Sequence, residues 1–205
     1  MTNAVIEDAV QAIRAGQPVV LPFDTVYGLA AEPYLEESTR RLYELKGRDE
    51  AQPSALVASS LDFLVECVPE LRGRPGTLAR LLLPGPVTLI LPNPARRFPW
   101  ITGPNKEAIG VRVPLLEGPG RWVLERVGAV VATSANHPGE PDPGRSEDVP
   151  EDIRSGAVAV VDGGELPGTP STVIDLTGRE PRIVREGALP AAEVLSRLAA
   201  AVPSS

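Results

Sequence analysis

The chain of 205 residues has a single cysteine, Cys67, and a single histidine, His137. One cysteine excludes an internal disulfide and a thiolate metal cluster, and one histidine excludes a metal site built on two imidazoles. The sequence also lacks a Walker loop, a GxGxxG segment and acidic clusters with metal-ligand spacing. We therefore expect no metal site made of protein ligands, and we expect any nucleotide to be bound by a less common arrangement.

Long apolar runs and an excess of basic residues are also missing. No run approaches the roughly 18 apolar residues that a membrane-spanning helix needs, and the start, "MTNAVIEDAVQAIRAG", lacks the layout of a signal peptide. We therefore expect a soluble, cytoplasmic protein. The net charge of −7 argues against a broad nucleic-acid footprint, because nonspecific binding to phosphates depends on many Lys and Arg side chains. A local basic pocket remains compatible with this charge.

Helical and strand patterns alternate along the chain. Apolar residues recur at helical spacing over residues 3–15, a strand is expected at 19–21, and a surface helix begins near 35 and ends near Gly47. Further helices are expected at 61–67, 76–83, 119–127, 147–155 and 190–201. Short β-rich runs predict strands at "ALVAS", "VTLIL", "IGVRV", "AVVAT", "AVAVV" (157–161), "STVIDL" and "RIV". The mixture predicts one α/β (α+β) domain over residues 1–205, built on a twisted sheet.

Small polar and cationic residues lie at the ends of several predicted strands, where open α/β sheets form binding sites. Taken singly, each also fits a structural role, such as a turn residue or an edge-strand cation. Five such endings together favour a site. Cations near a helix C-terminus are favoured by about 0.3–1 kcal/mol, which would by itself explain the two in "ELKGR". The residues concerned are Asp24, Thr25, Tyr27, Lys46, Arg48, Arg112, Ser134, Asn136, Ser171 and Arg185, and Gly28 is expected to let the backbone turn beside the first three.

Seven stretches carry a resemblance that runs from about residue 6 to residue 189. "LPFDTVYGL", "KGR", "LPGPVTLIL", "IGVRVP", "TSAN", "STVIDL" and "RIVREGAL" resemble, in this order, the motifs of the YrdC/Sua5 family of threonylcarbamoyl-AMP synthases. The resemblance implies a YrdC-like twisted mixed sheet, flanked by helices, around a deep, positively charged cavity. It also implies the short form of the family, without a C-terminal Sua5 domain.

The same resemblance implies an activity. Such an enzyme is a nucleotidyltransferase that forms threonylcarbamoyl-AMP and pyrophosphate from L-threonine, bicarbonate and ATP, for the N6-threonylcarbamoyladenosine of tRNA. A separate transferase completes the tRNA modification, so we expect little direct tRNA binding. The cofactor implied is Mg²⁺ carried by ATP.

Matching positions imply residue roles. The resemblance implies L-threonine binding by Thr25, Tyr27, Arg112 and Ser171, and nucleotide binding by Lys46, Arg48, Gln52, Ser134, Asn136 and Arg185. A guanidinium such as that of Arg112 suits a carboxylate, because it forms two parallel hydrogen bonds to it. Catalysis is expected to be positioning and charge stabilisation by Lys46, Arg48 and Arg185, with no general base from the protein.

Several positions depart from the family pattern. Phe23 replaces a usual threonine, and Ala108 and Gly144 replace frequent hydroxyl residues; Asp49 and Gln52 also differ from the residues usual after "KGR". These departures suggest the alternative of a noncatalytic relative that binds RNA or nucleotide. A carbamoyl-handling domain, like that of hydrogenase maturation proteins, is a further alternative. The retained cations and "TSAN" favour the active enzyme.

Overall fold

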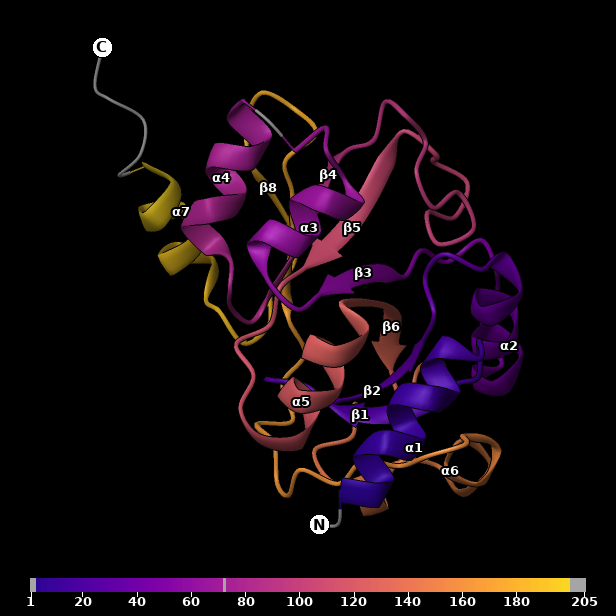
Figure 1. The fold of residues 1–205 in the computed structure, drawn as a ribbon. Helices are drawn as coiled ribbons and strands as arrows, with labels where there is room; N and C mark the ends of the chain where they lie inside the picture. Colours follow the sequence, from indigo (N-terminus) through magenta and orange to yellow (C-terminus); the bar gives the residue numbers. More distant parts are fainter. Residues whose placement is uncertain (1–2, 72, 200–205) are drawn as a thin grey trace.

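The computed structural model describes residues 3–71 and 73–199, and its strands form one eight-stranded sheet (Figure 1). The strand order is β1-β2-β6-β3-β5-β4-β7-β8. The β3–β5 and β4–β7 pairs are parallel, and the other pairs are antiparallel. The strands are β1 Val19–Pro22, β2 Tyr27–Ala31, β3 Ala55–Ala58, β4 Val87–Pro92, β5 Ala108–Arg112, β6 Ala129–Ser134, β7 Thr172–Asp175 and β8 Arg182–Arg185.

Helices cover the sheet from both sides and lie mostly where helical periodicity predicts them. They are α1 Asn3–Arg14, α2 Glu36–Lys46, α3 Leu61–Cys67, α4 Arg74–Leu82, α5 Gly118–Val127, α6 Glu151–Gly156 and α7 Ala191–Ala199. The predicted α/β class, with a twisted mixed sheet flanked by helices, is confirmed. Among the described residues, no helix is long and apolar enough to cross a membrane.

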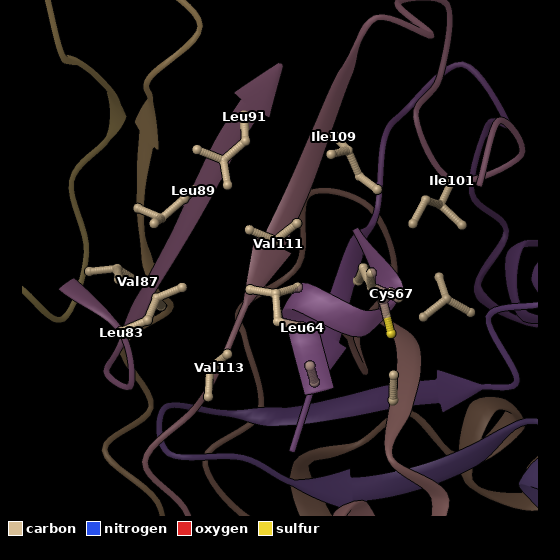
Figure 2. Packing of buried hydrophobic residues seen from close by; sticks show 14 of the residues in the cluster. Leu64, Cys67, Leu83, Val87, Leu89, Leu91, Ile101, Ile109, Val111 and Val113 are labelled. Carbon is tan, nitrogen blue, oxygen red and sulfur yellow. The ribbon is translucent and has the colours of Figure 1, made fainter. Parts of the chain in front are cut away.

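The two faces of the sheet bury separate cores because successive side chains of a strand point to opposite sides. On one face, α1 and α5 pack over the β1, β2 and β6 part of the sheet. On the other face, α3 contributes Leu64 and Cys67 to a larger core that includes Leu89 and Val111 (Figure 2). Helices α1 and α5 cover only part of their face of the sheet. On the rest of the same face, side chains of β3, β5, β4, β7 and β8 line a cavity.

Two predicted elements differ in the structure. The expected strand at 157–161 forms only an isolated bridge between Val20 and Val160, because the segment reaches the edge of β1 without a longer ladder. The expected helix at 147–155 is split into a 3-10 turn, Ser146–Asp148, and α6, since Pro150 lacks the N–H that a continuous helix needs. Residues 200–201 of the last predicted helix lie outside the described residues.

Strand β2 was not predicted, and its presence changes the expected position of Tyr27. Its sequence, "YGLAA", has little intrinsic strand preference, so its pairing with β1 and β6 decides its conformation. Tyr27 therefore begins a strand and does not belong to the turn after β1. Gly28 lies inside the strand without a positive φ, so the predicted backbone turn at this glycine is wrong.

Candidate active site

A cavity of about 690 Å³ lies on the open half of the sheet. Its floor is made of small residues: Ala55 pairs with Ala132 of β6 on one side and with Gly110 of β5 on the other, and all three line the cavity. Such short side chains leave the space above the sheet empty. Four arginines and two aspartates line the walls, so the lining is net cationic.

Arg112, at the end of β5, is fixed in the cavity wall and is only 8% exposed. Its Nη2 donates to the Asp24 carboxylate and, at 2.7 Å, to Thr25 Oγ1. The second Asp24 oxygen accepts the Leu115 N–H at 2.9 Å, so Asp24 anchors the arginine to the main chain. Burial lowers the pKa of Arg112 and Asp24 opposes this shift, which leaves a charged guanidinium suited to a carboxylate.

A hydroxyl pair and a second arginine lie on the β4–β7–β8 side of the cavity. Ser171 and Thr88 share a hydrogen bond of 2.9 Å between their hydroxyls. Arg185, on β8, donates to the Ser171 carbonyl at 2.7 Å and lines the same wall. Thr88 was missed in the sequence, although it is the one polar residue in "VTLIL" and alternates toward the cavity face.

Arg48 enters the cavity from the end of α2. Gly47 adopts a left-handed conformation, φ 64°, that ends the helix and turns the chain toward β6. Arg48 then donates to Thr133 Oγ1 at 3.1 Å and to the Pro53 carbonyl at 2.6 Å. Gln52 lines the cavity beside it.

Lys46, predicted to contact the nucleotide, lies behind the wall and is not among the residues that line the cavity. Its Nζ donates to the Ser134 carbonyl at 2.5 Å, to the Asn136 carbonyl and, at 2.9 Å, to Asn136 Oδ1. Burial and the nearby Arg48 lower the pKa of Lys46 to about 8, and Asp142 opposes this shift. At neutral pH the side chain is therefore an ammonium whose three hydrogens all have acceptors within the protein.

Asn136 shapes the loop that follows β6. Besides accepting from Lys46, its Oδ1 accepts the Ser134 hydroxyl at 2.6 Å, and its Nδ2 donates to the Glu140 carbonyl at 2.7 Å. Ser134 itself lines the cavity. The "TSAN" stretch thus forms a turn around a buried cation and presents a hydroxyl to the open side.

Tyr27, predicted to contact threonine, points away from the cavity and is not among the residues that line it. Its hydroxyl accepts the Gly163 N–H at 2.9 Å and lies 2.8 Å from Asp162 Oδ1 and 2.7 Å from the Gly164 carbonyl. Burial, with a smaller contribution from Asp162, raises the pKa of Tyr27 to about 12, while the hydrogen bond from the Gly163 N–H lowers it in part. Tyr27 therefore holds the segment that leads into Ser171.

The predicted site residues fall into three groups. Thr25, Lys46 and Asn136 support the wall from behind, and Tyr27 fastens a neighbouring segment. The rest line the cavity: Arg48, Gln52, Arg112, Ser134, Ser171 and Arg185. Of the family departures, Phe23 and Ala108 also line it. Sequence reasoning missed the lining residues Thr88, Asn105, Asp142, Asp175 and Arg182, whose positions depend on strand register and loop path.

His137 is a structural link outside the cavity. One ring nitrogen lies 3.2 Å from the Lys46 carbonyl and the other 3.0 Å from an Asp152 oxygen, so the ring joins the end of α2 to α6. The Lys46 carbonyl and Asp152 raise the pKa of His137. Within residues 3–71 and 73–199, no group of three His, Cys, Asp or Glu side chains could hold a metal ion.

The raised pKa of His137 predicts a pH-dependent stability. A group with a raised folded pKa stabilises the protein fully below its unfolded pKa of about 6.5, and this contribution disappears as the pH rises through the folded pKa. The variant His137→Gln should therefore unfold at lower urea than the parent at pH 5.5, with a smaller difference at pH 8.5. Urea unfolding at both pH values measures this. A difference that is the same at both would contradict it.

Comparisons with known proteins agree with this architecture. The family model for Sua5, YciO and YrdC, described as "Telomere recombination", matches residues 11–187. The chain belongs to the Sua5/YciO/YrdC family. Membership confirms the resemblance that the seven sequence stretches indicated.

Relatives within the Sua5/YciO/YrdC family have a named activity. The threonylcarbamoyl-AMP synthase of Pyrococcus abyssi is 34% identical over 183 residues, which cover 89% of this chain and 54% of the relative. That of Pseudomonas syringae is 35% identical over 190 residues, covering 89% and 97%. The chain thus spans about half of the archaeal relative and nearly all of the bacterial one.

A solved structure from the family superimposes closely. Pyrococcus abyssi Sua5 complexed with L-threonine matches with a TM-score of 0.86 and 35% identity, over 94% of this chain and 57% of Sua5. Escherichia coli YciO, at 24% identity and a TM-score of 0.82, shares the fold over 94% of this chain and 93% of its own.

Proposed function

We propose that this protein is a threonylcarbamoyl-AMP synthase, a nucleotidyltransferase that makes threonylcarbamoyl-AMP and pyrophosphate from L-threonine, bicarbonate and ATP. The observation that carries the proposal is the buried, anchored Arg112 in a net cationic cavity. All three substrates are anionic or carry a carboxylate, so they suit such a cavity. The identity of 34% and 35% to two proteins named as synthases supports the same activity.

The reaction proceeds in two steps. The threonine amine attacks the carbon of carbon dioxide, with loss of a proton, or that of bicarbonate, with loss of water, and in either case forms a carbamate. A carbamate oxygen then attacks the α-phosphorus of ATP, and the bond to the β-phosphate oxygen breaks, which releases pyrophosphate. The second step joins anions, so the protein contributes mainly orientation and positive charge.

In this proposal threonine and the nucleotide bind next to each other, and Arg185, which donates to the Ser171 carbonyl, lies where they meet. Arg112 binds the threonine carboxylate, with Thr25 fixing the arginine from behind and Ser171 beside it. Arg48 and Arg185 neutralise the phosphates, and Ser134 and Gln52 contact the nucleotide. ATP arrives with Mg²⁺ as part of the substrate.

Lys46 and Asn136 have indirect roles here. The Lys46 hydrogens are all donated to Ser134 and Asn136, so the lysine shapes the turn that presents the Ser134 hydroxyl. The product passes to a separate tRNA threonylcarbamoyl transferase in the cytoplasm. The net charge of −7 agrees with a protein that leaves tRNA binding to that partner.

Pyrophosphate release tests the proposal directly. The protein is mixed with MgATP, L-threonine and bicarbonate, and we expect release that requires all of them. Arg185→Gln should reduce the rate by about tenfold or more, because a hydrogen bond to a charged group contributes roughly 1.5–3 kcal/mol. Arg96→Gln is the matched control, since Arg96 pairs with Glu107 and is 65% exposed. Release that continued without threonine would contradict a synthase.

A further inference from the structure

Phe23 occupies a place next to Arg112 that only a neighbouring glycine makes available. Its ring lines the cavity, although only 5% of the residue is exposed. A Cβ atom built on Gly28 would lie 2.5 Å from Phe23 Cε2, closer than real side chains approach. Gly28 has ordinary strand geometry, so no turn requires a glycine at this position. The absence of a side chain instead leaves room for the Phe23 ring. Phe23 and Gly28 therefore form one packed unit at the end of β1 and the start of β2.

The Phe23 ring lies against the Arg112 guanidinium, with Cζ 5.8 Å from the ring centroid. An aromatic face attracts a guanidinium placed over it. This contact adds to the hydrogen bonds of the Arg112 side chain, which Asp24 and Thr25 accept.

Hydrogen bonds alone fix Arg112 incompletely. Within the described part of the chain, the hydrogen bonds of its side chain both start from Nη2, toward Asp24 and Thr25. Its Nε is buried without a partner. Both bonds come from one nitrogen, so the Phe23 ring is a further contact that restrains the rest of the guanidinium.

We infer that Phe23 is a positioning residue that holds the Arg112 guanidinium in the orientation needed to bind the amino-acid carboxylate. This inference rests on the proposed function and adds a residue that the family motif does not assign. Its effect should be larger for threonine than for ATP, because Phe23 contacts Arg112, whereas Arg48 is held by Pro53 and Arg185 by Ser171.

Phe23→Leu tests the inference, because leucine keeps an apolar side chain but has no aromatic face. We expect the KM for L-threonine to rise about fivefold to tenfold, as expected for a lost cation–π contact at a desolvated site. The KM for ATP should change less than about twofold, since the affinity for ATP does not depend on Arg112.

Phe98→Leu is the matched control. Phe98 is also buried, 7% exposed, and packs edge-on to Trp100 at 6.4 Å, away from the cavity lining. This variant should lower the melting temperature and leave both KM values unchanged. If Phe23→Leu behaved like Phe98→Leu, or raised both KM values equally, the positioning role would be overturned.

A second readout does not need activity. In ¹⁵N NMR of the ligand-free protein, the Arg112 Nε–H should exchange slowly with water, because this atom is buried. Phe23→Leu should speed the exchange, and Phe98→Leu should not. An Arg112 signal that Phe23→Leu leaves unchanged would overturn the inference. Absence of threonine-dependent pyrophosphate release from the parent protein would instead overturn the proposed function, and the NMR comparison would still decide the placement of Arg112.

Discussion

Replacing Arg112 with alanine is expected to raise the KM for L-threonine about 100-fold or more while the KM for ATP changes only a few-fold. Two charged hydrogen bonds from the Arg112 N–H groups that Asp24 and Thr25 leave free would each contribute roughly 1.5–3 kcal/mol, and about 3 kcal/mol corresponds to about 100-fold. Arg112 is anchored to Thr25, in the connection between β1 and β2, whereas Arg48 is bonded to Thr133 of β6. Steady-state pyrophosphate release with each substrate varied in turn measures the two constants.

The stability of the Arg112 variant needs its own control. Arg112 and Asp24 form an ion pair whose side chains are 10% and 9% exposed. Removing one partner of a buried pair costs about 3–5 kcal/mol, because the other charge stays buried. The double variant Asp24→Asn with Arg112→Met removes both charges and should recover much of the stability without recovering threonine binding. Equal increases in both KM values would contradict the assignment of Arg112 to threonine.

The sequence predicts those parts of the fold that depend on local pattern. Amphipathic spacing finds α1, and the glycine after "ELK" marks the end of α2 with the expected left-handed residue, Gly47. Strand β2 depends instead on its two neighbours, β1 and β6, and its glycine and alanines carry no local signal. The isolated bridge at Val160 likewise depends on its neighbour Val20 in the edge strand β1, which the local sequence does not reveal.

In the site, the types of the residues could be predicted from the sequence, but the directions of their side chains could not. Polar residues at strand ends correctly indicate which segments meet, because Arg112, Ser134 and Ser171 all line the cavity. The direction of each side chain depends on register, which the sequence alone does not fix. Tyr27 and Gly28 are adjacent in β2, and therefore only Gly28 lies on the cavity side. Knowledge of β2 would have placed Tyr27 correctly.

Replacing Lys46 with methionine should also destabilise the protein strongly. Lys46 is 2% exposed, and its ammonium is bonded to Ser134 and Asn136. Methionine fits the space but takes the ammonium donor away from the Ser134 and Asn136 carbonyls, and each buried unpaired group costs about 1–3 kcal/mol. We expect a loss of at least about 3 kcal/mol, which lowers the melting temperature by about 6–12 °C in a chain of this size. Thermal unfolding measures this.

Lys106→Met is the control for removing an ammonium, because Lys106 is less buried and bonds the single carbonyl of Pro99. Its effect should stay below about 1 kcal/mol. A double-mutant cycle of Lys46→Met with Asn136→Ala then separates the two roles of the lysine. If Lys46 acts through the turn, the two losses of stability are coupled by about 0.5–3 kcal/mol, because both remove one shared network. Purely additive losses, together with a large rise in the KM for ATP, would instead place the Lys46 ammonium on the phosphates.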